Sequence, residues 1–222
     1  MAHERDGPKG GVAVSGTLEL ASCPRVVAAL SGAGAALWWS EARVCPSPNR
    51  DARPLGSEPE LVVIHAISLP PGQFGGGFIE HLFTNTLEPR GHPYFAEIAD
   101  LRVSAHVLIG RDGRATQFVP FDERAWHAGV SCWNGRERCN DFSIGIELEG
   151  CDEQAFTDAQ YATLVRLIHW LRGRFPRLAA EGAIAGHADI APGRKTDPGP
   201  CFDWARLNEQ LKDGQLKPDP IT

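Results

Sequence analysis

The residues with the clearest potential for chemistry lie in one short stretch near the end of the chain, residues 186–200. An imidazole, an ammonium and a carboxylate stand within it, at His187, Lys195 and Asp197. Asp197 precedes a proline, which favours an extended backbone, and in an extended chain the side chains of Lys195 and Asp197 point the same way. An imidazole and a carboxylate can supply two of the three protein ligands of a catalytic zinc site, and a nearby lysine can stabilise charge on a carbonyl oxygen. The alternative is a surface turn whose charged side chains face solvent.

The third ligand has to come from elsewhere in the chain, and two histidines are candidates. Residues 61–65 form a continuous apolar run that ends in His65, which predicts a buried strand with the histidine at its C-terminal end. That end is where α/β sheets usually place their chemistry. His127 follows Trp126 in a predicted loop and is the rival ligand, while Trp126 could stack on a sugar. The alternatives are a hydrogen-bonded core histidine and ordinary core packing of the tryptophan.

A general base is available on a second predicted strand, residues 142–149. Apolar residues alternate there with small or polar ones, so one face of the strand should pack into the core. Glu147 and Glu149 share the opposite face. Two glutamates on such a face are usually only solvated, but if the face looks into the site, one of them becomes a general base.

The remaining pattern supplies the elements that would position these residues. Thr157 and Gln160 form a capping box that predicts the start of a long helix. The glycine-rich residues 69–77 predict a mobile loop directly after the His65 strand, where it could cover a ligand. Further predicted elements are a helix at 78–86, a hairpin of strands 103–109 and 115–119, a strand at 183–187, and a last helix capped by Asp203. His106, in the middle of the first hairpin strand, is read as structural.

Strands and helices interleave along the chain, which predicts a single α/β domain with a mixed central β-sheet flanked by helices. We expect this domain to span residues 37–212. Residues 1–36 are expected to be a flexible extension or to lie upstream of the true start, and residues 213–222 a C-terminal tail. A lipoprotein-like box at residues 20–23 lacks the hydrophobic segment that export requires.

Composition narrows the class of protein. The chain has 222 residues, 42% of them hydrophobic and 23% charged, and a net charge of −6, which offers no general attraction to nucleic acid or to an anionic membrane. No apolar run is long enough to span a bilayer. Six cysteines include no C-x-x-C pair, and a chain of this length folds without disulfides, so mostly reduced thiols of a cytosolic protein are expected.

Five segments of this sequence occur in a characteristic order. They are the strand ending in His65, Arg102-Val103-Ser104-Ala105-His106, Ala125-Trp126-His127-Ala128-Gly129, Ile144-Gly145-Ile146-Glu147-Leu148-Glu149-Gly150 and the run from Gly186 to Gly199. Together they resemble the zinc-dependent N-acetylmuramoyl-L-alanine amidases. The likeness runs from about residue 40 to residue 207 and is greatest to the cytosolic AmpD type, which acts on 1,6-anhydro-muropeptides in cell-wall recycling.

The resemblance implies a role for each site residue. His65, His187 and Asp197 become the ligands of a Zn²⁺ ion, Glu147 the catalytic base, and Lys195 the group that faces the oxyanion. Two neutral imidazoles and one carboxylate would leave the zinc site with a net charge of +1, enough to activate a water molecule.

It also implies residues for the substrate. Arg102 and Arg138 would bind the carboxylates of the stem peptide, and Trp126 would lie at the sugar end. The family commonly has Asn directly after the first ligand, where this chain has Ala66, so one contact to the peptide backbone is expected to be lost.

The expected function is hydrolysis of the amide bond between the lactyl group of (1,6-anhydro-)N-acetylmuramic acid and L-alanine of the stem peptide. The fold implied is that of the peptidoglycan-recognition and amidase proteins. We expect a cytoplasmic monomer that binds anhydro-muropeptide and neither nucleic acid nor membrane. The alternatives are an exported or lipid-anchored amidase acting on intact peptidoglycan, and a binding module without activity.

Overall fold

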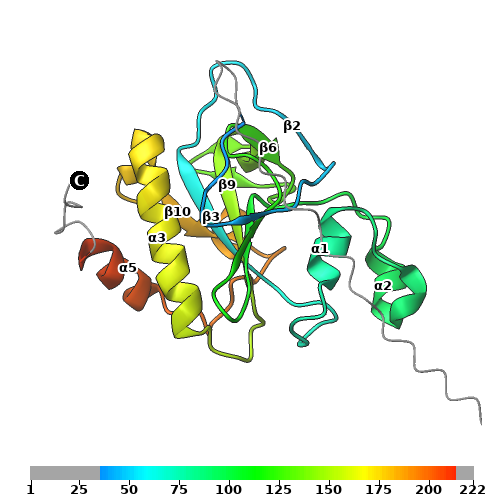
Figure 1. The fold of residues 1–222 in the computed structure, drawn as a ribbon. Helices are drawn as coiled ribbons and strands as arrows, with labels where there is room; N and C mark the ends of the chain where they lie inside the picture. Colours follow the sequence, from blue (N-terminus) through cyan, green and yellow to red (C-terminus); the bar gives the residue numbers. More distant parts are fainter. Residues whose placement is uncertain (1–35, 214–222) are drawn as a thin grey trace, which may run out of the picture.

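A mixed six-stranded sheet forms the centre of the molecule (Figure 1). The computed structural model describes residues 36–213, so the expectations for residues 1–35 and 214–222 lie outside the described part. The strand order is β1-β5-β4-β9-β3-β10. The strands are β1 (Arg43–Val44), β3 (Leu61–Ile67), β4 (Val107–Ile109), β5 (Ala115–Gln117), β9 (Ser143–Glu149) and β10 (Ile184–Gly186).

Two small antiparallel sheets and eight helical segments complete the described fold. The small sheets pair β2 (Arg50–Ala52) with β6 (Glu123–Ala125), and β7 (Cys132–Trp133) with β8 (Arg136–Glu137). The α-helices are α1 (Phe78–Phe83), α2 (Pro93–Ile98), α3 (Asp158–Arg174), α4 (His187–Ile190) and α5 (Trp204–Asp213). The 3₁₀ turns are Pro89–Gly91, Cys139–Asp141 and Pro176–Ala179.

The strands in the middle of the sheet are parallel, so the residues at their C-terminal ends lie together at one edge of the sheet. β9 and β10 both run parallel to β3. Every residue of β9 is buried, as are residues 61–65 of β3. The run of apolar residues that ends in His65 is therefore a buried strand, as predicted, and its C-terminal end lies beside those of its two neighbours.

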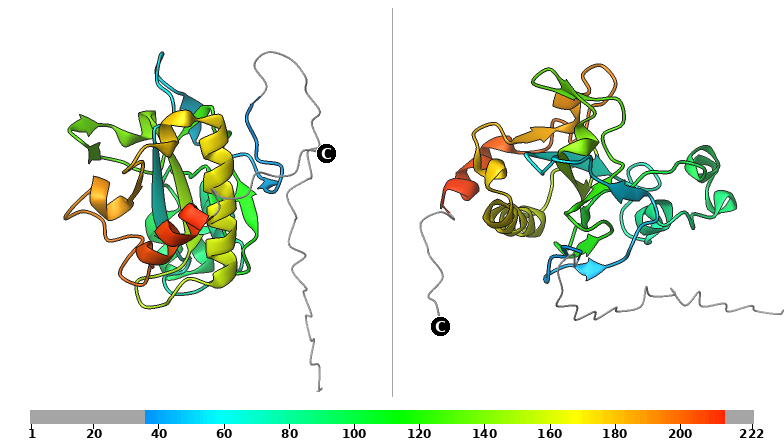
Figure 2. Two further views of the ribbon diagram at one scale, coloured as in Figure 1. Left: turned by 90° about the vertical axis from the view of Figure 1, so that its left-hand side faces the viewer. Right: turned by 90° about the horizontal axis from the view of Figure 1, so that it is seen from above.

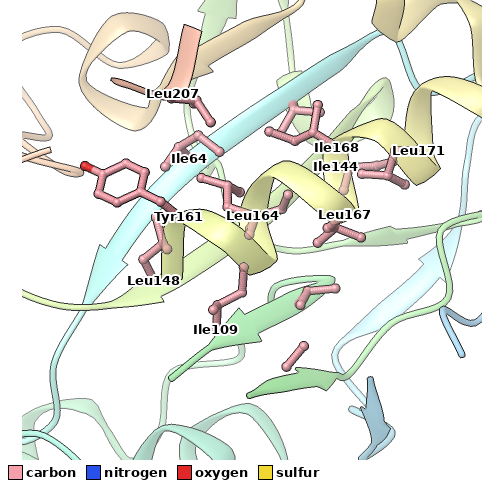
Figure 3. Packing of buried hydrophobic residues seen from close by; sticks show 14 of the residues in the cluster. Ile64, Ile109, Ile144, Leu148, Tyr161, Leu164, Leu167, Ile168, Leu171 and Leu207 are labelled. Atoms are coloured by element: carbon pink, nitrogen blue, oxygen red, sulfur yellow. The ribbon is translucent and has the colours of Figure 1, made fainter. Parts of the chain in front are cut away.

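One face of the sheet packs against α3 and α5, and this layer holds the largest group of core residues (Figure 3). Ile64 of β3 and Ile144 of β9 point into it, together with Leu164 and Leu207 of the two helices. The capping box is present as predicted: the Thr157 hydroxyl accepts from the backbone N–H of residue 160, whose side chain in turn accepts from Thr157 N–H.

The other side of the sheet carries α1 and α2, well separated from α3 in Figure 1 and in the right-hand view of Figure 2. Leu82 of α1 and Phe95 of α2 pack there against Leu108 of β4. Side chains alternate along each strand, so His65 and Glu147 point away from the α3 layer. The site therefore forms on the face opposite the main core.

Several predicted elements are shorter than expected, among them the second hairpin strand, predicted at 115–119 and ending at residue 117. The strand predicted at 103–109 begins only at Val107, because the chain before it bonds elsewhere: Ser104 N–H donates to Trp126 O and His106 N–H to Gly145 O. The helix predicted at 78–86 ends at Phe83. The strand predicted at 183–187 ends at residue 186, and His187 begins α4.

The turn at Gly113 is where the hairpin was predicted, with β4 and β5 antiparallel on either side of it. Cys132, Cys139, Cys151 and Cys201 are free thiols, as expected. None of the helices between residues 36 and 213 has the length and hydropathy to cross a bilayer.

Candidate metal centre

Three potential ligands meet at the C-terminal edge of the parallel strands. His65 belongs to β3, His187 opens α4 directly after β10, and Asp197 lies in the segment that follows α4. His65 Nδ1 lies 3.0 Å from His187 Nδ1 and 3.1 Å from Asp197 Oδ2, and the last two atoms are 3.0 Å apart. Residues far apart in the sequence thus point three electron-pair donors at one spot.

This cluster suits a cation. Two neutral imidazoles and a carboxylate would direct lone pairs at one another, and a bound positive charge relieves that repulsion. A tetrahedral zinc site with metal–ligand distances of about 2.0–2.1 Å places its ligand atoms roughly 3.3 Å apart, close to the three separations observed. Both histidines are buried, so water does not compete for their ring nitrogens. The donor set, its spacing and its burial fit Zn²⁺.

The surroundings of His65 and Asp197 keep these two donors in the forms that bind metal. Burial lowers the pKa of His65 to about 4, so its ring is neutral near pH 7. For Asp197, burial raises the pKa, but hydrogen bonds to His187 and His65 oppose it, and the pKa lies below its ordinary value. The carboxylate is therefore ionised, as a ligand must be.

The backbone around Asp197 is fixed by local hydrogen bonds. Asp197 O accepts from Ala188 N–H at 2.9 Å, which ties the segment back to α4. Lys195 N–H donates to Ala191 O at 3.1 Å within the intervening turn. A short segment with two such anchors holds the carboxylate near the histidines.

Glu147 lies on the strand next to His65. The two residues are direct partners in the parallel pairing of β3 with β9, so their side chains emerge on the same face. Glu147 is 9% exposed, and its Oε2 atom has no hydrogen-bond partner among the described residues. Burial, and secondarily the charge of Asp197, raise the pKa of Glu147 well above its ordinary value, while Lys195 lowers it. A carboxyl group of this kind is suited to proton transfer near neutral pH.

A cleft of about 390 Å³ opens over the cluster. Glu147, Lys195 and the three potential ligands line one part of it. Its other lining residues are mostly apolar or aromatic and include Tyr94, Ile98, Leu101 and Trp126. A cleft lined by both charged and apolar side chains suits an amphipathic substrate.

Glu149, the second glutamate on the strand face, has a different position. Its carboxylate accepts from Gly75 N–H at 2.5 Å and from Arg111 N–H at 3.2 Å. It lines a larger cavity of about 610 Å³ that contains none of the potential ligands. Volume alone would favour that cavity as the site, but the convergent donors and the unpartnered carboxyl oxygen favour the smaller one. Glu149 holds the glycine-rich loop through Gly75.

The two arginines expected to bind substrate lie outside the residues that line the cleft. Arg102 is exposed and donates to the backbone oxygens of Ala99 and Leu101, the second of which belongs to a cleft residue. Arg138 is exposed and pairs with Asp141 at 3.2 Å. Trp126 does line the cleft, and its indole N–H donates to Asp51 at 3.2 Å. Ala66 lines the cleft with a methyl group only.

His127, the rival third ligand, is close to the cluster without joining it. Its Nδ1 faces His65 Nε2 at 2.9 Å, on the side of the ring that points away from His187 and Asp197. Sequence reasoning had no signal for Asn140, whose side-chain oxygen accepts from the backbone N–H groups of His127 and Ala128. Asparagine in a polar loop resembles any other turn residue in the sequence.

The chain is similar to a family of known proteins over most of its length. Residues 55–200 match the family model described as N-acetylmuramoyl-L-alanine amidase. The chain is 60% identical over 174 residues to the 1,6-anhydro-N-acetylmuramyl-L-alanine amidase AmpD of Enterobacter cloacae, covering 78% of this chain and 92% of the relative. It is 62% identical over 170 residues to the AmpD of Escherichia coli K12, covering 77% and 92%.

Solved structures of amidases have a similar fold. A crystal structure of a selenomethionine derivative of AmpD superposes with a TM-score of 0.76 at 60% identity, covering 78% of this chain and 96% of the other. The amidase AmiD from E. coli, in complex with the substrate anhydro-N-acetylmuramic acid-L-Ala-D-γ-Glu-L-Lys, has a TM-score of 0.52 at 33% identity, covering 71% and 60%.

Proposed function

This chain belongs to the N-acetylmuramoyl-L-alanine amidase family, and it hydrolyses the amide bond between N-acetylmuramic acid and L-alanine; we propose that its natural substrates are 1,6-anhydro-muramyl peptides and that its metal is Zn²⁺. The substrate proposal is supported by the relatives named for the anhydro sugar, which share about 60% of their residues with it. The observation that carries the mechanism is the cluster of His65, His187 and Asp197 beside Glu147.

His65, His187 and Asp197 would hold the zinc ion, through Nδ1 of each histidine and a carboxylate oxygen. When bound, zinc supplies Lewis acidity, which polarises the amide carbonyl and makes water a stronger acid. Burial of both imidazoles supports this assignment, because it shields their ring nitrogens from water, and for His65 it also keeps the ring neutral and available as a ligand.

Glu147 is proposed as the general base and then the general acid. Its carboxylate takes a proton from the attacking water and later gives a proton to the amine of L-alanine as the C–N bond breaks. A group that changes role in this way needs a pKa between those of an ordinary carboxylate and an amine, and burial raises the pKa of Glu147 in that direction.

Lys195 is proposed to stabilise the negative charge that develops on the carbonyl oxygen. It lines the same cleft as Glu147 and the metal ligands, and its ammonium group donates up to three hydrogen bonds. Lys195 is an exposed residue at this cleft, and a cation that reaches the carbonyl oxygen favours the charged transition state over the neutral substrate.

For the substrate, we propose that Trp126 contacts the sugar and that Arg102 and Arg138 bind the carboxylates of the stem peptide. Trp126 is in the cleft and its ring is held by Asp51. Both arginines are exposed and close in sequence to residues of the site, so they can reach a peptide that extends beyond the cleft. Ala66 replaces a polar side chain, so the peptide backbone is held here by one contact fewer.

We further propose that the protein acts in the cytoplasm as a monomer, on fragments recovered from the wall, without binding nucleic acid or membrane. The net charge of −6 supports the last part of this proposal, because it offers no general attraction to nucleic acid or to an anionic membrane. An exported or lipid-anchored amidase that cuts intact peptidoglycan is the alternative.

The test is mass spectrometry of the products made from a defined anhydro-muramyl tripeptide, from its reducing-sugar counterpart and from intact sacculi. We expect free tripeptide from the anhydro substrate, little product from sacculi, and loss of activity with a chelator that added Zn²⁺ restores. Faster release from sacculi than from the anhydro substrate would contradict the proposed substrate. Full activity without metal would contradict the proposed zinc.

A further inference from the structure

The two ligand histidines share an unusual pair of outer contacts. Each turns Nδ1 toward the metal position, so each Nε2 must carry the proton and needs an acceptor. His65 Nε2 lies 2.9 Å from His127 Nδ1, and His187 Nε2 lies 3.1 Å from Ala128 O. The two acceptors therefore come from consecutive residues of one loop.

That loop is held in place by contacts that do not involve the ligands. Asn140 Oδ1 accepts from His127 N–H at 3.1 Å and from Ala128 N–H at 2.8 Å, so one amide oxygen fixes both peptide units. An Arg194 guanidinium nitrogen also donates to Ala128 O, at 2.7 Å.

The His127 ring is enclosed on its far side as well. Its Nε2 lies 3.2 Å from Ser143 Oγ, so a ring that accepts at Nδ1 can donate its own proton there. Gly145 leaves the space for the ring, because a Cβ atom at that position would lie 2.4 Å from His127 Cγ. The ring therefore has one orientation and one suitable tautomer.

We propose that His127 and Ala128, clamped by Asn140, orient both zinc-ligand histidines from one loop. His127 is then a positioning residue: it accepts the Nε2 proton of His65 and so presents Nδ1 to the metal. Asn140 acts one step further out, through the backbone. The inference rests on the proposed zinc site and explains why a buried histidine stands next to the cluster without belonging to it.

The experiment measures zinc affinity by competition with a chromophoric chelator on the full chain. His127→Phe keeps an aromatic ring and removes the nitrogen that accepts from His65. Asn140→Leu keeps a side chain of similar size and removes the oxygen that accepts from the N–H groups of His127 and Ala128. Each should weaken zinc binding about 10- to 100-fold, the range typical of lost outer contacts to ligand histidines. His127→Asn and Asn140→Asp each keep an oxygen near the accepting atom and should restore most of the affinity.

Two controls separate this role from others. His169→Phe makes the same replacement on α3, away from the cluster, and should leave zinc affinity unchanged. Urea unfolding of each metal-free variant shows whether lost affinity reflects lost folding. Gly145→Ala, which crowds the ring without removing a polar group, should weaken zinc binding in the same direction as His127→Phe.

Nuclear magnetic resonance gives a readout independent of affinity. In the zinc-loaded enzyme, the ¹⁵N shifts of His127 should show an unprotonated Nδ1 and a protonated Nε2. A protonated Nδ1, or a zinc affinity unchanged in His127→Phe, would overturn the inference while leaving the zinc site intact. A wild-type protein that takes up no zinc would overturn the proposed metal and the inference with it.

Discussion

At the scale of single residues, the two glutamates of β9 have opposite surroundings although they are only two positions apart. Glu147 has an oxygen without a hydrogen-bond partner among the described residues and lies beside the proposed metal ligands, whereas Glu149 accepts hydrogen bonds from two backbone N–H groups. Glu147→Gln should therefore fold, keep its zinc and lose about two to four orders of magnitude in turnover, the usual contribution of a general acid–base group. Steady-state kinetics and metal analysis of the purified variant measure both effects.

Glu149→Gln is the matched control, since it makes the same change on the same strand face. It should retain most of the turnover, with any effect arising through the loop that Glu149 holds at Gly75. Equal losses of turnover in the two variants would contradict the assignment of the base to Glu147.

Lys195 is predicted to matter for the chemical step rather than for metal binding. Lys195→Ala should lower kcat by about 10²- to 10³-fold, the usual loss when one oxyanion-stabilising group is removed, with zinc affinity little changed. Lys195→Arg keeps the charge and should recover part of the rate. A variant whose KM rises while kcat stays normal would show that the lysine binds substrate without stabilising the transition state.

The residues proposed as ligands could be singled out from the sequence, and their role as ligands stays a prediction. His65 ends an apolar run and Asp197 lies in a proline- and glycine-rich segment, and the family resemblance selected both. His127 was ambiguous, since which way a ring nitrogen points depends on Asn140 and Gly145, residues distant from it in the sequence. The roles of Glu147, Lys195, Arg102 and Arg138 stay predictions until the variants are measured.

At the scale of elements, α3 is a structural support that does not touch the substrate cleft. Thr157→Ala removes the hydroxyl that accepts from the backbone at the first turn. It should lower the free energy of unfolding by about 1 kcal/mol, the typical loss for a helix cap. Urea denaturation measures this, and kcat/KM at 25 °C should stay unchanged. A large loss of activity in a fully folded variant would mean that α3 also acts on the site.

The pattern of hydrophobic residues predicted the buried strands well and their lengths less well. β3 and β9 could be recognised in the sequence because they are buried: one face of each strand packs into the main core and the other faces the candidate site. The segment before Val107 has the same β-like composition, yet its backbone N–H groups bond to Trp126 and Gly145 outside a regular ladder. Hydrogen bonding to distant segments, which local composition does not encode, sets where this strand begins.

At the scale of the whole molecule, several neutral histidines are buried in one region, and this predicts how the metal-free protein responds to acid. Burial lowers the pKa of His65 to about 4 and holds those of His106 and His127 well below the ordinary value. Below about pH 6.5 these histidines are protonated in the unfolded chain but stay neutral in the folded chain. The free energy of unfolding therefore falls as the pH is lowered, by up to about 1.4 kcal/mol per pH unit for each histidine.

Urea unfolding of the chelator-treated protein between pH 7.5 and pH 4.5 tests this. His106→Asn keeps an acceptor for Gly145 N–H but removes one titrating group. The free energy of unfolding of this variant should depend less steeply on pH, by the contribution of one histidine. Stability that is independent of pH over this range would contradict the prediction.

The three proposed metal ligands do not lie in one local segment: His187 and Asp197 are 10 positions apart, but His65 is far from both. His65 meets His187 across 122 positions of sequence and Asp197 across 132. During synthesis, zinc could be bound only after the last of these residues has left the ribosome and the parallel strands have paired. Pairing of strands that are far apart in the sequence is slow, because a long loop has to close first. Metal uptake should thus follow folding rather than guide it. Zinc would then slow unfolding and leave the refolding rate unchanged, so that the loaded enzyme persists longer in the cell without being produced any faster.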